Sequence, residues 1–241
     1  MPFTELTDRP GTGRTYTEAV RAAIGDAGAT GRVRLDAIAR WLQDTAYYDL
    51  VDAGWDPPGP WLVRRLRIRV ERFPEFPERL ELTTWCSGVG PAVAERRTSV
   101  RGEEGALIES AALWVFLDPV KQRPAPHSET FMAVYRAAAN GRRARTKLYH
   151  RPTPPPGAAA RASFSFRAAD LDPARHVNNA AYWAVLEDEL AERGAGEPVD
   201  IEIEHRNATG PGPADVLADQ QGGRWVVADG AVVATFVGVP S

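Results

Sequence analysis

The stretch DLDPARHVNN, residues 170–179, places two carboxylates, one of the chain's four histidines and paired asparagines directly before a helical pattern. Starting at Asn179, side chains recur at the spacing of one helix face: Tyr182, Trp183, Leu186 and Leu190. Gly194 after Arg193 is typical of a helix end. The sequence therefore predicts a helix over 177–193 with a polar cluster at its N-terminus.

This cluster has two interpretations. Unpaired N–H groups and partial positive charge at a helix N-terminus suit a carbonyl oxygen that gains negative charge, which makes Asp172 and His176 candidate catalytic residues. Asp and Asn are also the commonest turn and N-cap residues, because their side chains accept hydrogen bonds from nearby backbone N–H groups. On local chemistry alone a capped turn is the commoner outcome, so the rest of the chain has to decide.

Composition sets the class of protein. The chain has 241 residues, 44% of them hydrophobic and 25% charged, and a net charge of −3, which is ordinary for a soluble globular protein and gives no case for nucleic acid as a partner. Cys86 is the single cysteine, which excludes an intrachain disulfide and fits a reducing compartment. No stretch resembles a signal peptide or the ~20 apolar residues of a membrane span. We expect a cytoplasmic protein without membrane contact.

The first half of the chain reads as a strand, a long helix and four more strands. A strand over 14–24 precedes a helix over 35–50 that Gly54 ends and whose apolar circumference predicts burial. Four extended segments follow, over 62–70, 80–86, 92–102 and 108–117. In the first, arginines alternate with apolar residues and predict a basic outer face. The last is apolar on both faces around Trp114, which predicts a central strand.

The second half repeats this plan. A short helix over 127–138 and a basic loop lead to a proline cluster at 152–157, which is typical of a stiff linker. Beyond it come a strand over 161–168, the polar cluster with its helix, and strands near 199–206, 214–220, 223–229 and 231–238. We infer an internal duplication, with units at 1–150 and 151–241.

A long apolar helix wrapped by a curved antiparallel sheet is the hot dog arrangement. The chain is therefore expected to be an α+β protein with a double hot dog fold, in which two tandem units each wrap a sheet around a long central helix. A narrow tunnel between the units suits a linear acyl chain. This step is an analogy at the level of the fold.

The sequence resembles the acyl-acyl carrier protein thioesterases of bacteria and plants, which hydrolyse fatty acyl thioesters and so end chain elongation. The matching stretches run in the family's order over most of residues 14–238: 30–37 and 41–44 around the first helix, 61–65, 70–74 and 84–88 in the strands, and 170–179 with Tyr182. The resemblance implies the double hot dog fold, a thioester hydrolase activity, no cofactor and no metal.

The resemblance also assigns residues. The family's loop carries aspartate, asparagine and histidine at alternate positions, and the outer two correspond to Asp172 and His176, while Ala174 stands at the middle one. Ala208 stands near a glutamate that many members use to activate water. We expect Asp172 to act as general base or nucleophile, His176 to orient it or exchange protons, and Asn178 or Asn179 to replace the missing amide. The other expected supporting residues are Asp170 and Tyr182.

The remaining polar residues point to other roles. Cys86 in its strand and the other histidines are expected to serve packing or the surface: His127, His150 and His205. The acidic helix face is expected to be solvated: Glu187, Asp188, Glu189 and Glu192. The implied partner is acyl carrier protein, whose acidic surface would meet exposed cations, with these candidates: Arg64, Arg65, Arg142 and Arg143. A solvated basic surface is the alternative.

Two other functions stay open at this point. Another hot dog enzyme, an acyl-CoA thioesterase or a dehydratase, would share the architecture. Ala174 and Ala208 also leave room for a non-catalytic acyl-binding protein. The sequence sets neither the acyl chain length nor the oligomeric state, monomer or homodimer.

Overall fold

The computed structural model describes residues 3–55, 60–191 and 197–240. The first half of the chain contains β1 (Thr15–Arg21), α1 (Leu35–Asp52), β2 (Trp61–Arg72), β3 (Arg79–Val89), β4 (Val93–Gly102), β5 (Leu107–Phe116) and α2 (Glu129–Ala139). The second half contains β6 (Ala159–Phe166), η3 (Ala181–Leu186), α3 (Glu187–Ala191), β7 (Val199–His205), β8 (Gly212–Ala218), β9 (Arg224–Ala228) and β10 (Ala231–Val237). Short 3₁₀ turns lie at Ile24–Asp26 and Ala168–Asp170.

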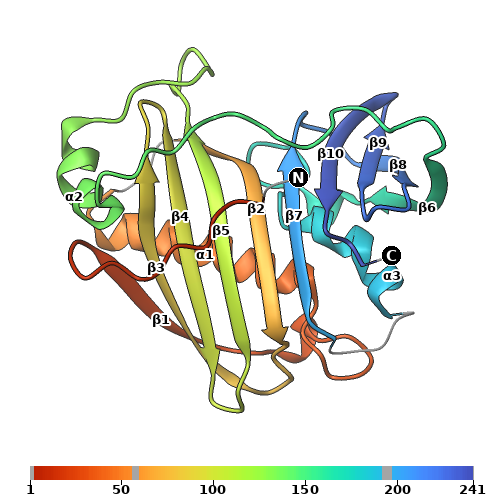
Figure 1. The fold of residues 1–241 in the computed structure, drawn as a ribbon, viewed down its shortest axis with the longest axis horizontal. Coiled ribbons are helices and arrows are strands. Elements are labelled where there is room, and N and C mark those ends of the chain that lie inside the picture. Colours follow the sequence, from red (N-terminus) through yellow and green to blue (C-terminus); the bar gives the residue numbers. More distant parts are fainter. Residues whose placement is uncertain (1–2, 56–59, 192–196, 241) are drawn as a thin grey trace.

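All ten of these strands join one antiparallel sheet, in the order β1-β3-β4-β5-β2-β7-β10-β9-β8-β6 (Figure 1). Read from its outer edge, each half has the same order of first, third, fourth, fifth and second strand. The two halves meet through their second strands, β2 and β7. The repeated plan expected from the sequence is thus confirmed, and β5 is an interior strand as predicted. The double hot dog fold follows from this doubled, curved sheet.

Helix α1 packs on one face of the first half of the sheet (Figure 1). Asp36 lies in its first turn, where negative charge suits the helix dipole, and Gly54 follows its end with φ +93°, a conformation that glycine adopts without strain. The predicted helix is confirmed. Its burial is less complete than expected, because Trp41 lies in the core whereas Tyr47 and Tyr48 are about half exposed.

Strands β2 and β7 join the two halves of the sheet. Acidic residues of β7 lie opposite three arginines of β2: Arg65, Arg67 and Arg69. Arg67 donates two hydrogen bonds to the Asp200 carboxylate, of 2.6 and 2.7 Å. On the other face, leucine and isoleucine side chains of both strands enter the core. The strands therefore join through ion pairs on one face and apolar packing on the other.

The basic face of β2 is covered, which corrects the prediction of a solvated surface. Arg65 is only 4% exposed. The chain between α2 and β6 crosses this face of the sheet, and so does the N-terminal segment (Figure 1). Phe3 stacks on the Arg67 guanidinium, and Thr4 is buried and donates its backbone N–H to Glu202. The N-terminal segment from Phe3 onward is therefore packed against the sheet.

The second half lacks a helix as long as α1 in its described residues. A 3₁₀ segment, η3, runs directly into α3, so the helix expected over 177–193 begins at Ala181 and reaches at least Ala191. The predicted end at Gly194 lies outside the described residues, as does Glu192. None of the helices in the described ranges combines the length and the apolar character needed to span a bilayer.

Removing one carboxylate at the β2–β7 junction should strongly destabilise the fold. Glu204→Ala removes the acidic partner of the half-buried Arg206 and one of the two carboxylates within 4 Å of the buried Arg65. Breaking a buried ion pair by removing one partner costs about 3–5 kcal/mol. Urea unfolding followed by tryptophan fluorescence measures this change. The matched control is Glu103→Gln, at an exposed glutamate, which should stay within about 0.5 kcal/mol. Equal stability of both variants would contradict a structural role for the junction.

Candidate active site

A cavity of about 290 Å³ lies between α1, the inner face of the sheet and α2. Its walls come mostly from the first half of the chain, including Leu50, Trp61, Trp114 and Phe131. Two residues of the second half, Asp172 and Asn179, complete the lining. The loop that the sequence singles out therefore lies against a cavity built by the other half of the protein.

Asp172 sits in a tight turn that the backbone itself closes. Its N–H donates to the carbonyl of His176 at 2.8 Å, and its Oδ1 accepts the N–H of His176 at 3.2 Å. Arg175 adopts φ +64° within this turn. The Asp172 side chain is half-buried and makes no ion pair with any described residue. A carboxylate that faces a cavity without a cation beside it is available to a reactant.

The two asparagines have different roles. Asn178 caps the turn, since its Oδ1 accepts the N–H of Ala180 at 2.9 Å and its own N–H donates to Asp170. Asn179 lines the cavity. The backbone N–H groups of its neighbours on both sides are engaged, whereas that of Asn179 has no acceptor among the described residues. Asn179 therefore lines the cavity and has a backbone N–H that is unpaired within the described chain, whereas the side chain of Asn178 caps the turn.

Three other expected site residues lie away from the cavity lining. His176 is exposed to solvent beyond the turn. Asp170 pairs with Arg167 and accepts its backbone N–H; burial raises its pKa, but these hydrogen bonds from Arg167 bring the pKa below its usual range. Tyr182 is 2% exposed and packs between Phe166 and the other ring it contacts, His205. Asp170 and Tyr182 therefore stabilise the loop through contacts outside the cavity lining.

The acidic residues of the following helix do not form a solvated face. Glu187 accepts hydrogen bonds from Arg32 and from the backbone of Leu35 at the start of α1. Glu189 pairs with Arg224 on β9. Asp188 alone of these three is exposed. Glu187 thus ties the second helix to the first, and the expectation of solvation was wrong for both glutamates.

The four arginines expected to dock a carrier protein differ in exposure. Arg65 is buried at the sheet junction and is not available to a partner, which corrects that assignment. Arg64 is half-buried and donates to the carbonyl of Arg206, and Arg142 pairs with Glu95. Arg143 is exposed. A docking surface has to be built from Arg143 and its exposed neighbours.

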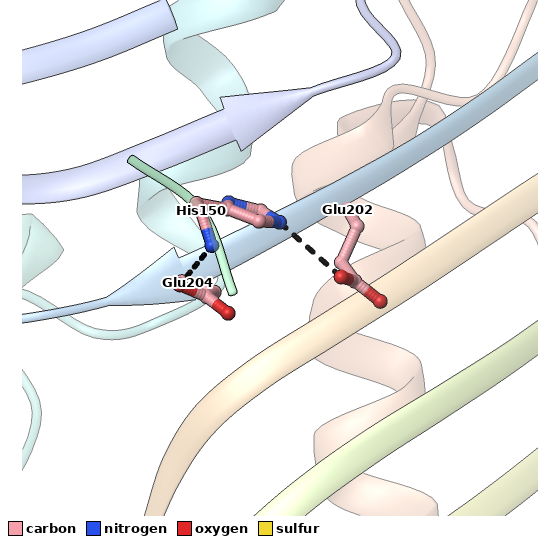
Figure 2. Close-up of side chains that lie close together, drawn as sticks. All are labelled: His150, Glu202 and Glu204. Atoms are coloured by element: carbon pink, nitrogen blue, oxygen red, sulfur yellow. Dashed lines mark hydrogen bonds and ion pairs between the residues drawn. The ribbon is translucent and has the colours of Figure 1, made fainter. Parts of the chain in front are cut away.

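His150, Glu202 and Glu204 form a buried group with the ligand types of a metal site (Figure 2). The group's atoms are engaged by the protein itself. His150 Nε2 contacts Glu202 at 3.2 Å, and Glu204 accepts the backbone N–H groups of Tyr149 and His150. Arg65 lies within 4 Å of both carboxylates. A dication would have to displace the guanidinium of Arg65, so the group suits a structural anchor for the linker.

Three further polar residues of the first half belong to the cavity lining: Arg96, Tyr135 and Cys86. Arg96 pairs with the fully buried Asp49 behind the wall. Burial raises the pKa of the Cys86 thiol to about 11, against the lowering effect of Arg96. The thiol therefore stays protonated at neutral pH, consistent with the expected packing role.

Sequence reasoning missed two polar residues of the lining, Gln43 and Asp44 on α1. Both fall on the helix face that also carries Ala46, Tyr47 and Leu50 into the cavity. Their signal in the sequence was a polar pair within an otherwise apolar helix. That pair could have been singled out from helical periodicity, since buried helix faces rarely carry a carboxylate without a partner.

Comparison with known proteins identifies the family. The family model described as the acyl-ACP thioesterase N-terminal domain matches residues 13–135, and the C-terminal domain model matches 155–217. The chain belongs to the acyl-ACP thioesterase family. Two Mycobacterium tuberculosis relatives, uncharacterized proteins MT2057 and Rv2001, are each 28% identical over 179 residues, covering 74% of this chain and 71% of theirs.

Solved structures show the same fold. An acyl-ACP thioesterase from Bacteroides thetaiotaomicron aligns with a TM-score of 0.71 at 18% identity, over 92% of this chain and 96% of that chain. A 12:0-ACP thioesterase from Umbellularia californica aligns with a TM-score of 0.71 at 18% identity, over 92% of this chain and 95% of its own. This member of the acyl-ACP thioesterase family is a thioester hydrolase that acts on fatty acyl-ACP.

Stability of this thioesterase should fall in mild acid because His205 is buried. Burial, together with the charge of Arg64, lowers the pKa of His205 to about 3, whereas an unfolded histidine has a pKa near ~6.5. Between these values the unfolded chain binds a proton that the folded chain does not, so stability is lost as pH falls from about 6.5 towards 3. Burial also lowers the pKa of His127, in the same direction.

His205→Phe should therefore reduce the slope of melting temperature against pH between pH 7 and 5 without abolishing it. Scanning calorimetry in a buffer series measures this slope. The control His176→Phe changes an exposed histidine and should keep the wild-type slope. A slope unchanged in His205→Phe would show that another group carries the acid sensitivity.

Proposed function

We propose that this thioesterase hydrolyses its acyl thioester at the contact between the loop at 172–179 and the cavity, with Asp172 as the nucleophile. Asp172 lines the cavity and makes no ion pair in the described ranges. Ala174 and Ala208, which stand at polar positions of the family, are both exposed and outside the lining, so nothing there holds a water beside Asp172. Direct attack by the carboxylate needs no such water.

The developing oxyanion is held by Asn179. An oxyanion needs fixed donors at the place where charge appears. The Asn179 backbone N–H has no acceptor among the described residues, and Asn179 lines the cavity. Its side-chain amide adds a second donor at the cavity. Attack by Asp172 gives a tetrahedral anion, and its collapse expels the thiolate and leaves an acyl-aspartyl anhydride.

His176 exchanges the proton of the leaving thiol. The thiol of the pantetheine arm departs towards solvent, and His176 stands on the solvent side of the turn that holds Asp172. Histidine is the residue type best suited to proton exchange at neutral pH. Asn178, Asp170 and Tyr182 act as positioning residues for this turn.

The carrier protein is proposed to dock on the exposed cations that follow α2. Arg143, Arg145 and Lys147 are exposed on one short segment, and acidic carrier surfaces favour such a cluster. We also propose that residues 1–150 and 151–241 are the two repeating units, that the protein is cytoplasmic, and that it works as a monomer or homodimer. Hydrolysis on CoA is the second candidate substrate, since the cavity itself recognises only the acyl group.

Asp172→Asn should lower turnover on acyl carrier protein thioesters by at least ~100-fold, because an amide is not a nucleophile. Release of carrier thiol, followed by its reaction with a chromogenic disulfide, measures turnover. Asp188→Asn changes an exposed carboxylate on the helix that follows and should retain full rate. Equal rates for Asp172→Asn and the wild type would reject the assigned nucleophile.

His176→Ala should also lower the rate by at least ~100-fold if its imidazole exchanges the leaving-group proton. The defect should shrink with thioesters of more acidic thiols, which leave without a proton. A series of thiol leaving groups measures this trend in the same assay. Near-full turnover with the pantetheine thiol would remove His176 from the mechanism.

Docking through exposed cations should depend on salt. Arg143→Glu combined with Arg145→Glu should raise KM for the carrier-bound substrate several-fold at low salt, and the effect should fade at high salt because exposed charges are screened beyond ~10 Å at 0.1 M. The control Arg79→Glu lies at the other end of β3 and should leave KM unchanged. A short pantetheine thioester without carrier should be hydrolysed equally by all variants. Salt-independent KM in the wild type would contradict the docking surface.

A further inference from the structure

The mechanism proposed for this thioesterase leaves one step without a catalyst. Hydrolysis of an acyl-aspartyl anhydride needs a water molecule that gives up a proton as it attacks. The second half of the chain, which supplies Asp172, has alanine at both positions where the family would place a further polar group, Ala174 and Ala208. Any base for that water has to come from another part of the cavity wall.

Asp44 is a second carboxylate on that wall. It lies in the middle of α1, and it lines the same cavity as Asp172 and Asn179. Gln43, the residue before it, also lines the cavity and adds an amide that can hold a water molecule. The first half of the protein thus presents a carboxylate and an amide to the loop that the second half presents.

Asp44 differs from the other carboxylates buried in this structure. Most of those are tied to cations, Asp49 to Arg14 and Arg96, and Glu204 to Arg206. Asp44 is only half-buried, yet within the described parts of the chain it makes no ion pair or hydrogen bond. A partly desolvated carboxylate without a partner costs stability, which indicates that it is retained for another purpose.

The surroundings of Asp44 raise the pKa of its carboxyl group. Burial raises the pKa of its carboxyl above the usual range; Arg40, one helical turn earlier, lowers it, and Glu18 on β1 raises it. Arg96 from β4 and Asp172 from the loop also line the cavity. A carboxylate with a raised pKa is a stronger base than an exposed one.

We propose that Asp44 is the general base for the second half of the reaction, activating the water that hydrolyses the acyl-Asp172 anhydride. The water oxygen bonds to the acyl carbon while its proton passes to Asp44, and the carbonyl electron pair moves to the oxygen. Collapse breaks the bond between the acyl carbon and the Asp172 oxygen, which restores the Asp172 carboxylate and frees the fatty acid. Asp44 then returns its proton to solvent.

This inference rests on the proposed function, and the Asp44→Asn variant separates the two. The first step does not involve Asp44, so Asp44→Asn should release one equivalent of thiol per enzyme in a burst, followed by turnover about 100-fold slower than wild type. The trapped acyl group should appear in the intact-protein mass as one added acyl unit. Asp44→Glu should recover part of the steady-state rate, and Asp52→Asn, a largely exposed carboxylate on the same helix, should match the wild type.

Four other results have distinct meanings. A wild type that releases no thiol refutes the proposed function. Steady-state turnover of Asp44→Asn within about threefold of the wild type overturns the role of Asp44 and leaves the function standing. Slow turnover without a burst or an acyl adduct overturns the assignment to the second step. A merely structural Asp44 would show a lowered melting temperature in the Asn variant, whereas an unpaired carboxylate replaced by an amide should keep or raise it.

Discussion

The alternation of arginines on β2 against carboxylates on β7 is the constraint on which the rest of the structure depends. Either strand alone would carry a buried row of like charges, and each becomes acceptable only in the presence of the other. A shift of one residue in their pairing would bury the charges in the core and expose the leucines and isoleucines of the opposite face. The register between the halves is therefore fixed by charge and by apolar packing together.

This register decides where the site forms. Joining the second strands places α1 beside η3, where Glu187 caps the start of α1 through the N–H of Leu35. The loop before η3 is thereby held against the cavity on α1. His150 and Thr4 lock the same junction from its outer face by their contacts with Glu202. Elements distant in the sequence thus act together to position Asp172.

Local pattern predicted much of this fold, and tertiary contacts account for what it missed. Periodicity located α1, the strands and the repeated plan, because period and turn residues are local properties. It predicted a solvated basic face on β2, since the carboxylates that cover it lie about 130 residues away in β7. It placed a helix start at 177, where Asn178 instead caps a turn and η3 begins at Ala181. The sequence pattern located the loop at 172–179. It did not locate the cavity that this loop lines, because most of the lining residues come from the first half of the chain.

The proposed internal duplication, followed by specialisation of each half, would account for a site built in this way. Both halves keep the same strand order, yet the first has a long helix with a cavity, and the second has, in the described residues, a shorter helix and a loop that lines this cavity. Polar groups lost from the loop are tolerable when the opposite wall carries Gln43 and Asp44. In the proposed mechanism the catalytic work is divided between the halves, and neither half alone contains both the carboxylate that attacks and the carboxylate that activates water. Selection for activity would in this way also preserve the ion-paired junction that holds the halves together.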